Sequence, residues 1–367
     1  MKKKEHTVDF AKITEPNFEV LLKENKKLKR SLGTYKTNNY VLKRTNQGLE
    51  EVIKDVKNRQ KFMDAVEGSF VAKKLKIKGK SRGKEATAIA CLSDIHCEEN
   101  VDPETVNGIN EYNLKIAGKS LDTYFVKLLY LIKHERQIVP IENLVLAWLG
   151  DFISGYIHEE LMEDNSLSPT QACRWLLKHL CSGIDLLLEE GDFKQITVIC
   201  KIGNHGRTTQ KKRVSTAYKN SYEWLLYHFI AWHYQNKGEK RIKWVIEKGY
   251  HTYLDVYKFP CRFHHGDDMR YFGGVGGITI PVNKAIADWN KLRPVYLDFF
   301  GHFHTMLDLG NWVSNGSVIG HNAFGIKVKA KPERPQQTLS IIDKEHGKTK
   351  TLPIFVRPAK FIHGFNG

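Results

Sequence analysis

The stretch that decides the fold is ATAIACLSDIH at residues 86–96, an apolar run that ends in a polar cluster. The run Ala86–Leu92 has the length and composition of a buried strand, and Asp94 and His96 follow it directly. Further along the chain, three more apolar runs end in the same way. They are Leu144–Leu149, Gln195–Ile202 and Tyr296–Phe300. The sequence therefore predicts strands that each deliver polar side chains where they end.

Longer segments with helical periodicity separate the first three runs, near Leu114–His134 and Ala172–Glu189. Strands that alternate with helices are typical of an α/β domain whose sheet is covered on both faces. Toward the C-terminus the chain alternates and turns like a hairpin, ending in Thr338–Ile342 and Thr349–Val356. We expect one α/β domain over residues 86–367.

The polar clusters at the strand ends consist of ligand-type residues. In chain order they are Asp94-Ile95-His96, Gly150-Asp151, Gly203-Asn204-His205-Gly206, His264-His265-Gly266-Asp267 and Gly301-His302-Phe303-His304. Loops from several strands converge at the carboxyl ends of parallel strands, where ligands bind. A single histidine after a strand is usually an ordinary hydrogen-bonded residue, but five clusters in order predict a metal site. Mixed carboxylate, amide and imidazole ligands suit Mn, Fe or Zn better than Mg or Ca.

The motif order D-x-H, G-D, G-N-H, a later H and G-H-x-H resembles the calcineurin-like metallophosphoesterase superfamily over about residues 86–356. The resemblance implies a four-layer α/β/β/α sandwich, with two sheets face to face, helices outside and a two-metal site. Protein Ser/Thr phosphatases of this superfamily read G-D-x-V-D-R-G, whereas this chain reads GDFISG at residues 150–155. Ser154 replaces the carboxylate that would orient the catalytic histidine. The chain therefore looks closer to the DNA-repair exonuclease and phage phosphoesterase branches.

Carried over by position, the resemblance implies one metal ion held by Asp94, His96 and His304, and another held by Asn204, His265 and His302, with Asp151 bridging the two. His265 is preferred to His264 because Gly266 follows it. Mn is the expected metal, with Fe or Zn as alternatives. His205 would protonate the leaving oxygen as general acid while a metal-bound hydroxide attacks phosphorus.

Basic residues near the clusters indicate a large anionic substrate. Arg207 and Lys211 follow His205, and Arg270 follows the His265 cluster, so these three are the predicted substrate-binding residues. The alternative for the first two is an ordinary basic loop that leads into a helix, and substrate contact is the favoured interpretation. The predicted function is a phosphodiesterase that cleaves nucleic acid, expected to be DNA, as an exo- or endonuclease. Two alternatives stay open: hydrolysis of nucleotides or other small phosphate esters, and a nucleic-acid-binding scaffold with an inactive metal site.

Most of the excess positive charge lies in the first quarter of the chain. The whole chain has 57 Lys and Arg against 41 Asp and Glu, and residues 1–85 alone have 23 against 11. The charge is densest in the predicted linker, residues 71–85. Contacts to a phosphate backbone would make binding salt-dependent. A solvated linker explains the composition equally well. Some repair nucleases of the superfamily need an ATPase partner, and such a partner stays open here.

Residues 1–70 are predicted to form a helical arm. One column of residues recurs every seven positions: Leu21, Leu28, Tyr35, Leu42, Leu49, Val56, Met63 and Phe70. The neighbouring column includes Asn25, Asn39 and Asn46. Apolar residues at one core position and Asn at the other are typical of a weak coiled coil, which predicts a homodimer through this helix. The alternative is an arm that packs on the body of its own chain.

The composition excludes several classes of protein. An aromatic content of 11% excludes a chain that is disordered throughout. Six scattered cysteines without a CxxC pair argue against a disulfide scaffold. The charged N-terminus leads into no apolar segment, and no apolar run approaches the roughly 20 residues that span a bilayer. We therefore expect a cytoplasmic protein with no membrane partner.

Overall fold

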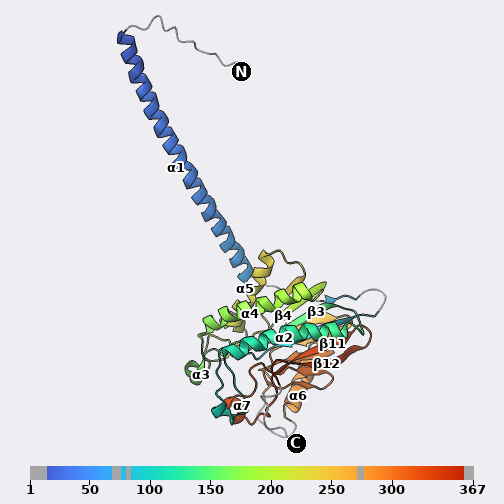
Figure 1. The fold of residues 1–367 in the computed structure, drawn as a ribbon. Coiled ribbons are helices and arrows are strands. Elements are labelled where there is room, and N and C mark those ends of the chain that lie inside the picture. The colour runs from blue at the N-terminus through green and yellow to red at the C-terminus, as the bar shows by residue number, and fades with distance from the viewer. Residues whose placement is uncertain (1–14, 68–75, 80–83, 271–276, 359–367) are drawn as a thin grey trace. The chain divides into compact units, whose positions relative to one another are not determined.

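The computed structural model describes residues 15–67, 76–79, 84–270 and 277–358, and the chain divides into two units, Met1–Asp64 and Ala65–Gly367. Helix α1 (Glu15–Glu67) is one continuous helix of 53 residues (Figure 1). The rest of the predicted arm lies outside the described residues. The apolar side chains of the predicted heptad column that the structure describes are exposed, for example Leu28 at 69% and Tyr35 at 64%.

The second unit contains two six-stranded mixed sheets. The first has the strand order β12-β11-β2-β3-β4-β5. Its strands are β2 (Ala86–Leu92), β3 (Ile141–Trp148), β4 (Gln195–Cys200), β5 (Ile242–Ile246), β11 (Gln336–Asp343) and β12 (Gly347–Phe355). Strands β2 to β5 run parallel, and β11 is antiparallel to both of its neighbours.

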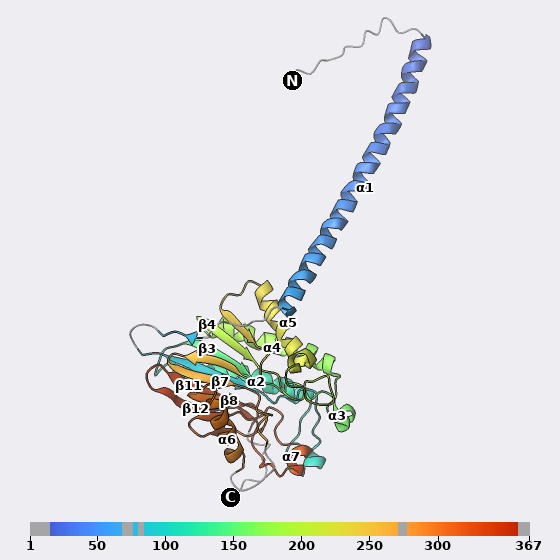
Figure 2. The same cartoon turned by 180° about the vertical axis from the view of Figure 1, so that it is seen from behind.

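The second sheet has the order β1-β6-β7-β8-β10-β9. Its strands are β1 (Lys76–Ile77), β6 (Thr252–Val256), β7 (Phe259–Phe263), β8 (Leu297–Phe300), β9 (Leu307–Asp308) and β10 (Trp312–Ser314). Strands β7, β8 and β10 run parallel to one another. Figure 2 shows β7 and β8 on the α6 side of the molecule.

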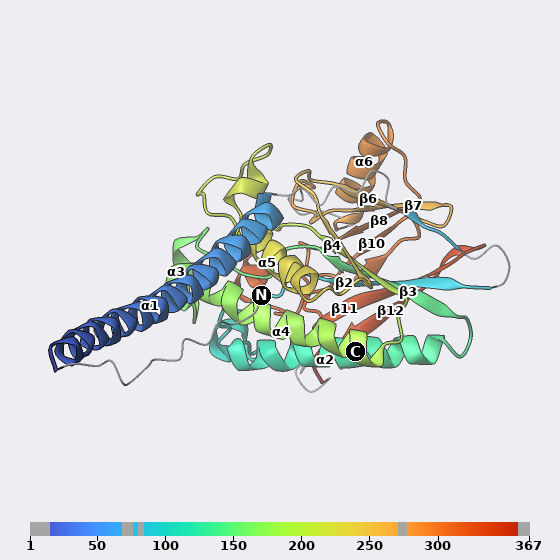
Figure 3. The same ribbon diagram turned by 90° about the horizontal axis from the view of Figure 1, so that it is seen from above.

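Helices cover the outer faces of the two sheets. Helices α2 (Leu114–Glu135), α4 (Pro169–Glu190) and α5 (Tyr222–Asn236) pack together on the first sheet, and α6 (Thr279–Asn290) packs on the second (Figure 3). Two short helices, α3 (Glu159–Asp164) and α7 (Ala323–Lys327), lie in the connections. The layer order is helix, sheet, sheet, helix, which confirms the predicted four-layer α/β fold.

The burial of strand β2 explains why its sequence is apolar except for Thr87, whose buried hydroxyl donates to the Tyr257 hydroxyl at 2.9 Å. Ala88, Ala90 and Leu92 pack in the core beneath the helices, whereas Ile89 and Cys91 pack in the core between the two sheets. Successive side chains of a strand point to opposite faces, so a strand with a core on each side has no polar face.

Helix α4 begins at a capping box, three residues before the helical segment expected near Ala172–Glu189. The Ser168 side chain accepts a hydrogen bond from the backbone of Gln171, and the Gln171 side chain accepts one from the backbone of Ser168. Pro169 is the first helical residue, where its missing N–H costs nothing. This capping box sets the end of the helix that packs between α2 and α5.

The predicted linker at residues 71–85 contains a strand. In β1, Lys76 pairs with Asp255 and Ile77 with Val256, and Ile77 is buried in the core between the sheets. Lys76 and Ile77 of this stretch thus belong to the second sheet. Residues 71–75 and 80–83 of the predicted linker lie outside the described residues.

Candidate metal centre

Five loops meet at the carboxyl ends of parallel strands, and each carries one of the predicted clusters. The loops follow β2, β3 and β4 of the first sheet, and β7 and β8 of the second. They place Asp94, Asp151, Asn204, His265 and His302 just beyond these five strands. Because the two sheets pack face to face, the strand ends of both supply one site.

The first group of possible metal ligands consists of Asp94, His96 and His304. One donor atom from each lies within 4.8 Å of the other two. Nε2 of His304 lies 3.4 Å from Oδ1 of Asp94. Asp94 also accepts hydrogen bonds from the Ser93 hydroxyl, at 2.5 Å, and from the backbone of His302, at 3.0 Å, so its carboxylate is fixed in place.

The second group consists of Asp151, His265 and His302, whose donor atoms also lie within 4.8 Å of one another. Nε2 of His265 lies 3.0 Å from Oδ2 of Asp151 and 3.1 Å from Oδ1 of Asn204. Its Nδ1 donates to the backbone carbonyl of Leu149 at 2.7 Å, which turns Nε2 toward the group. The structure thus brings all seven predicted ligands together in two neighbouring sets.

His264 points away from this centre. Its Nε2 lies 3.4 Å from Oδ1 of Asp298, and its ring stacks on Phe300. Asp298 also binds the buried guanidinium of Arg262. The geometry therefore places His265, and not His264, among the possible ligands.

The backbone at five of the candidate ligands is unusual. Asp94, His96, Asp151, His302 and His304 all have positive φ, between 48° and 71°. Asp, Asn and His tolerate the left-handed region better than other residues with a side chain. Such outliers cluster at functional sites, where the surrounding structure holds them.

Two glycines allow the loops to approach the carboxylates. A Cβ at Gly203 would lie 2.0 Å from Oδ1 of Asp151, and a Cβ at Gly301 would lie 2.6 Å from Oδ2 of Asp94. No other residue type fits at either position without moving a carboxylate. These contacts explain the glycine in the G-N-H and G-H-x-H motifs of this chain.

His205 lies beside both groups without belonging to either. Its backbone N–H donates to Oδ1 of Asp151 at 2.8 Å, and its ring centroid lies 4.7 Å from that of His96. Nδ1 lies 3.2 Å from the backbone carbonyl of Ser154. The histidine is therefore oriented by a main-chain oxygen in place of a side-chain carboxylate.

The side chain of Ser154 orients a different histidine. Its hydroxyl lies 2.9 Å from Nδ1 of His96 and donates to Oε2 of Glu99 at 2.8 Å. Nε2 of His96 is buried, and no atom of the described residues forms a hydrogen bond with it. A buried nitrogen of this kind costs free energy unless something binds it, so the residues present fit a divalent cation here.

A buried glutamate joins two of the ligand loops. Glu223 of α5 accepts hydrogen bonds from the backbone N–H of Phe152 at 2.5 Å and of Gly203 at 2.7 Å. These neighbours of Asp151 and Asn204 are thereby tied together. Burial, followed by the charge of Asp151, raises the pKa of Glu223 to about 8.

Burial and neighbouring charges shift the pKa values of several candidate ligands. Burial alone would raise the pKa of Asp151, but the imidazoles of His265 and His205 outweigh it and hold that pKa well below its usual value. Burial lowers the pKa of His96 and that of His302, the latter to about 4. Two other histidines shift the opposite way: burial lowers their pKa values, but the Asp151 carboxylate outweighs it and raises the pKa of His265 to about 10, and Asp94 likewise raises the pKa of His304. A metal requires ionised carboxylates and neutral imidazoles, so metal binding would release the protons of these two histidines.

The three predicted substrate-binding residues differ in whether other groups of the protein hold their side chains. The guanidinium of Arg207 donates to the carbonyls of Asn204, Thr209 and Gln210, so it braces its own loop. Lys211 and Arg270 are exposed. Their role in binding substrate stays a prediction.

Sequence reasoning missed Glu223, Glu99 and the double role of Ser154. Glu99 follows His96 by three residues, a spacing that could have suggested a contact. Glu223 is 19 residues beyond Asn204 in sequence, and no local pattern signals its contacts.

Among the described residues, no helix has both the length and the apolar character to cross a membrane.

Comparison with known proteins gives distant structural likeness. No family model matches the sequence, and no curated protein matches it. A hypothetical protein from Pyrococcus horikoshii OT3 is 12% identical over 75% of this chain and 90% of that chain, with a TM-score of 0.36. A dimetal phosphatase from Danio rerio is 8% identical over 74% and 99%, with a TM-score of 0.31. A single mutant of Vps29 from Entamoeba histolytica is 10% identical over 72% and 98%, with a TM-score of 0.29. Values of this size carry no inference about activity, so the function is argued from the chain's own residues.

Proposed function

We propose that this protein is a metal-dependent phosphoesterase with two divalent cations, and that its substrate is a nucleic-acid phosphodiester. The observation that supports this is the pair of ligand groups, Asp94–His96–His304 and Asp151–His265–His302, beside an unligated His205. Asn204 adds a neutral oxygen to the second group, and Asp151 is proposed to serve both ions. Mn²⁺ is the proposed cation, with Fe or Zn as alternatives.

Two bound cations would neutralise the phosphoryl oxygens and lower the pKa of the attacking water. The chain's own contribution is to hold the ligands before metal arrives. The Leu149 carbonyl accepts a hydrogen bond from His265, the Ser154 hydroxyl bonds to Nδ1 of His96, and the Ser93 hydroxyl donates to Asp94. These hydrogen bonds orient the three ligands. Pre-oriented ligands reduce the reorganisation that binding requires.

His205 is proposed to give a proton to the leaving oxygen. A carbonyl can only accept, so Nδ1 of His205 carries a proton toward Ser154, and Nε2 is free to exchange the other. As water adds to phosphorus, the bond from phosphorus to the leaving oxygen breaks, and that oxygen takes the Nε2 proton. The effect of a positioned acid is typically 10²–10⁴-fold in rate.

Nucleic acid is proposed over a small ester because of the charge distribution. Residues 1–85 have 23 Lys and Arg against 11 Asp and Glu, and Lys26, Lys27, Lys29 and Arg30 are exposed on α1. Clustered cations bind a polyphosphate backbone by releasing counterions. A small phosphate ester would gain nothing from such a surface.

The test is Mn-dependent cleavage of end-labelled single- and double-stranded DNA, with EDTA as a control. Cleavage is expected to disappear with EDTA. Asp151→Ala should lose bound metal and activity together, whereas His205→Ala should keep the metal and lose turnover, most severely for poor leaving groups. Full metal content and full turnover in Asp151→Ala would refute the site.

The same experiment separates the alternatives. Intact DNA together with rapid hydrolysis of a small aryl phosphate ester would identify an enzyme for small esters. Metal binding without hydrolysis of either kind would identify a scaffold whose centre is structural.

A further inference from the structure

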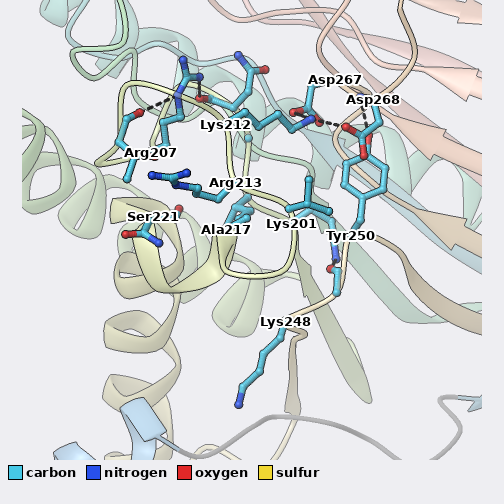
Figure 4. Close-up of a pocket in the computed structure, with 17 residues that line it drawn as sticks. Lys201, Arg207, Lys212, Arg213, Ala217, Ser221, Lys248, Tyr250, Asp267 and Asp268 are labelled. Atoms are coloured by element: carbon cyan, nitrogen blue, oxygen red, sulfur yellow. Dashed lines mark hydrogen bonds and ion pairs between the residues drawn. The ribbon is translucent and has the colours of Figure 1, made fainter.

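A pocket lies beside the second ligand group. It is formed by three segments, the loop between β4 and α5, the turn between β5 and β6, and the loop after β7 (Figure 4). Gly203 and Asn204 form part of its wall, and Asp267 and Asp268 lie on another side. Among the described residues that line it, neither His205 nor any member of the Asp94 group occurs. The pocket therefore adjoins the metal centre on the side of Asn204.

The wall of this pocket combines apolar surface with positive charge. Ile202, Val214, Ala217 and Tyr250 supply the apolar and aromatic part. The remaining lining includes five cations and two acids: Lys201, Arg207, Lys212, Arg213, Lys248, Asp267 and Asp268. A pocket of this composition matches an organic group that is linked to an anion.

Most of these cations are already engaged. Lys212 forms ion pairs with Asp267 and Asp268, and the buried ammonium of Lys201 donates to the carbonyl of Gly249 at 2.6 Å. Arg207 braces its own loop, as described above. Lys248 lies near the ring of Tyr218, 5.2 Å from its centroid.

Arg213 differs from these four. It is exposed, and within the part of the chain that the structure describes no hydrogen bond or ion pair holds its guanidinium. Figure 4 shows its side chain extending across the pocket, while Lys212 turns toward the two aspartates. Arg213 can therefore offer its donors to a bound anion, and a guanidinium binds phosphate in a bidentate manner.

We propose that this pocket binds the non-leaving ester group of a phosphodiester, a nucleoside whose next phosphate contacts Arg213. This inference rests on the proposed function. A diester has two organic groups, and the one that leaves must lie within reach of His205. The other needs space elsewhere, and the pocket provides that space next to Asn204. A monoester has no second organic group to place there, so the pocket selects diesters.

The experiment compares substrates that share one leaving group. The full-length Mn-loaded protein is given p-nitrophenyl esters of methyl phosphate, of thymidine 5′-phosphate and of thymidine 3′,5′-bisphosphate. In both thymidine compounds the p-nitrophenyl group is on the 5′-phosphate, so the bisphosphate differs only by its free 3′-phosphate. The wild type is expected to prefer the thymidine ester to the methyl ester by at least tenfold in kcat/KM. It should prefer the bisphosphate to the thymidine ester by at least a further fivefold.

Two variants locate these preferences in the pocket. Ala217→Phe places a ring in the pocket and should remove the preference for thymidine over methyl. Arg213→Gln should remove only the added preference for the 3′-phosphate, and it changes an exposed side chain that the fold does not need. Lys219→Gln removes a nearby exposed charge that does not line the pocket, so both ratios should stay as in the wild type.

The outcomes separate the two proposals. Equal kcat/KM for the methyl and thymidine esters in the wild type would overturn the pocket assignment while leaving phosphoester hydrolysis intact. Unchanged ratios in both pocket variants would overturn it as well. No Mn-dependent hydrolysis of any of the three esters would overturn the proposed function itself.

Discussion

The backbone carbonyl of Ser154 lies 3.2 Å from Nδ1 of His205, while the hydroxyl of the same residue lies 2.9 Å from Nδ1 of His96. One residue thus orients the proposed acid through its main chain and a proposed ligand through its side chain. The two functions can be separated, because a substitution changes only the side chain.

Ser154→Ala is expected to weaken Mn binding by roughly 10–100-fold, since the hydroxyl that links His96 to Glu99 is lost. At saturating metal, kcat should stay within about threefold of the wild type because the carbonyl that holds His205 remains. Calorimetric Mn titration and steady-state kinetics measure the two effects. Ser120→Ala is the control, because it removes a buried hydroxyl that bonds to nothing in the part of the chain that the structure describes. A large fall in kcat at saturating Mn would contradict the assignment.

Glu223→Gln is expected to lower the free energy of unfolding by about 1–3 kcal/mol. Glutamine offers one acceptor oxygen, whereas the Glu223 carboxylate accepts from both Phe152 and Gly203. Urea unfolding of the metal-free protein measures the change. Glu189→Gln alters an exposed side chain on α4 and should change stability little. Equal stability of the two variants would show that the carboxylate does not hold the loops.

The stability contributed by Lys201 is expected to depend on pH. Burial lowers the pKa of this lysine from 10.5 to about 8, so the folded state binds its proton less tightly than the unfolded chain does. Between about pH 8 and about pH 10.5 the unfolded chain therefore carries more protons, and folding stability rises with pH. Relative to Lys201→Met, wild-type stability should rise by up to about 3 kcal/mol across this window and stay level below it. Chemical unfolding at a series of pH values tests this, and a flat difference above pH 8 would contradict it.

The predicted dimer depends on the heptad column of α1. Leu28 and Leu42 are exposed at 69% and 58%, and a second copy of the helix would cover them. Leu28→Asn with Leu42→Asn should shift the protein toward monomer in sedimentation velocity. Leu22→Asn makes the same change on an exposed residue outside the column and should leave the sedimentation coefficient unchanged. A wild type that sediments as a monomer at all concentrations would refute the dimer.

The arm is expected to contribute to the salt dependence of DNA binding. Changing Lys26, Lys27, Lys29 and Arg30 together to Gln should reduce the slope of log affinity against log salt by up to about 3.5, because each neutralised phosphate contributes about 0.9. Fluorescence anisotropy with duplex DNA at several salt concentrations measures this slope. The same slope in the variant would exclude these residues from the interface.

The sequence was most informative where strands are buried on both faces. The predicted strand Ala86–Leu92 coincides with β2, and Leu144–Leu149 overlaps β3. A short, mostly apolar run is typical of a strand that has a core on each face. In parallel strands, the residues that follow each strand then lie together at the carboxyl edge of the sheet. For that reason the ligand clusters could be identified before any contact was known.

Contacts between distant segments could not be predicted in this way. Strand β1 has two residues, and its place beside β6 depends on pairing with residues more than 170 positions away. The hydrogen bonds of Glu223 depend on how α5 docks against two loops. Likewise, the basic residues after His205 look equivalent in sequence. The folded loop distinguishes them: the Arg207 guanidinium donates to carbonyls of its own loop, whereas the Arg213 side chain is exposed.

The left-handed backbone at Asp94, His96, Asp151, His302 and His304 has a consequence for protein engineering. A valine or isoleucine at any of these positions would incur a conformational penalty of roughly 1–2 kcal/mol in addition to the lost donor atom. Substitutions intended to change the preference of the proposed metal centre are therefore restricted to a few residue types, chiefly Asp, Asn, His and Gly. In a saturation library at these five codons, most variants would therefore be destabilised by their backbone conformation, whatever the chemistry of the new side chain.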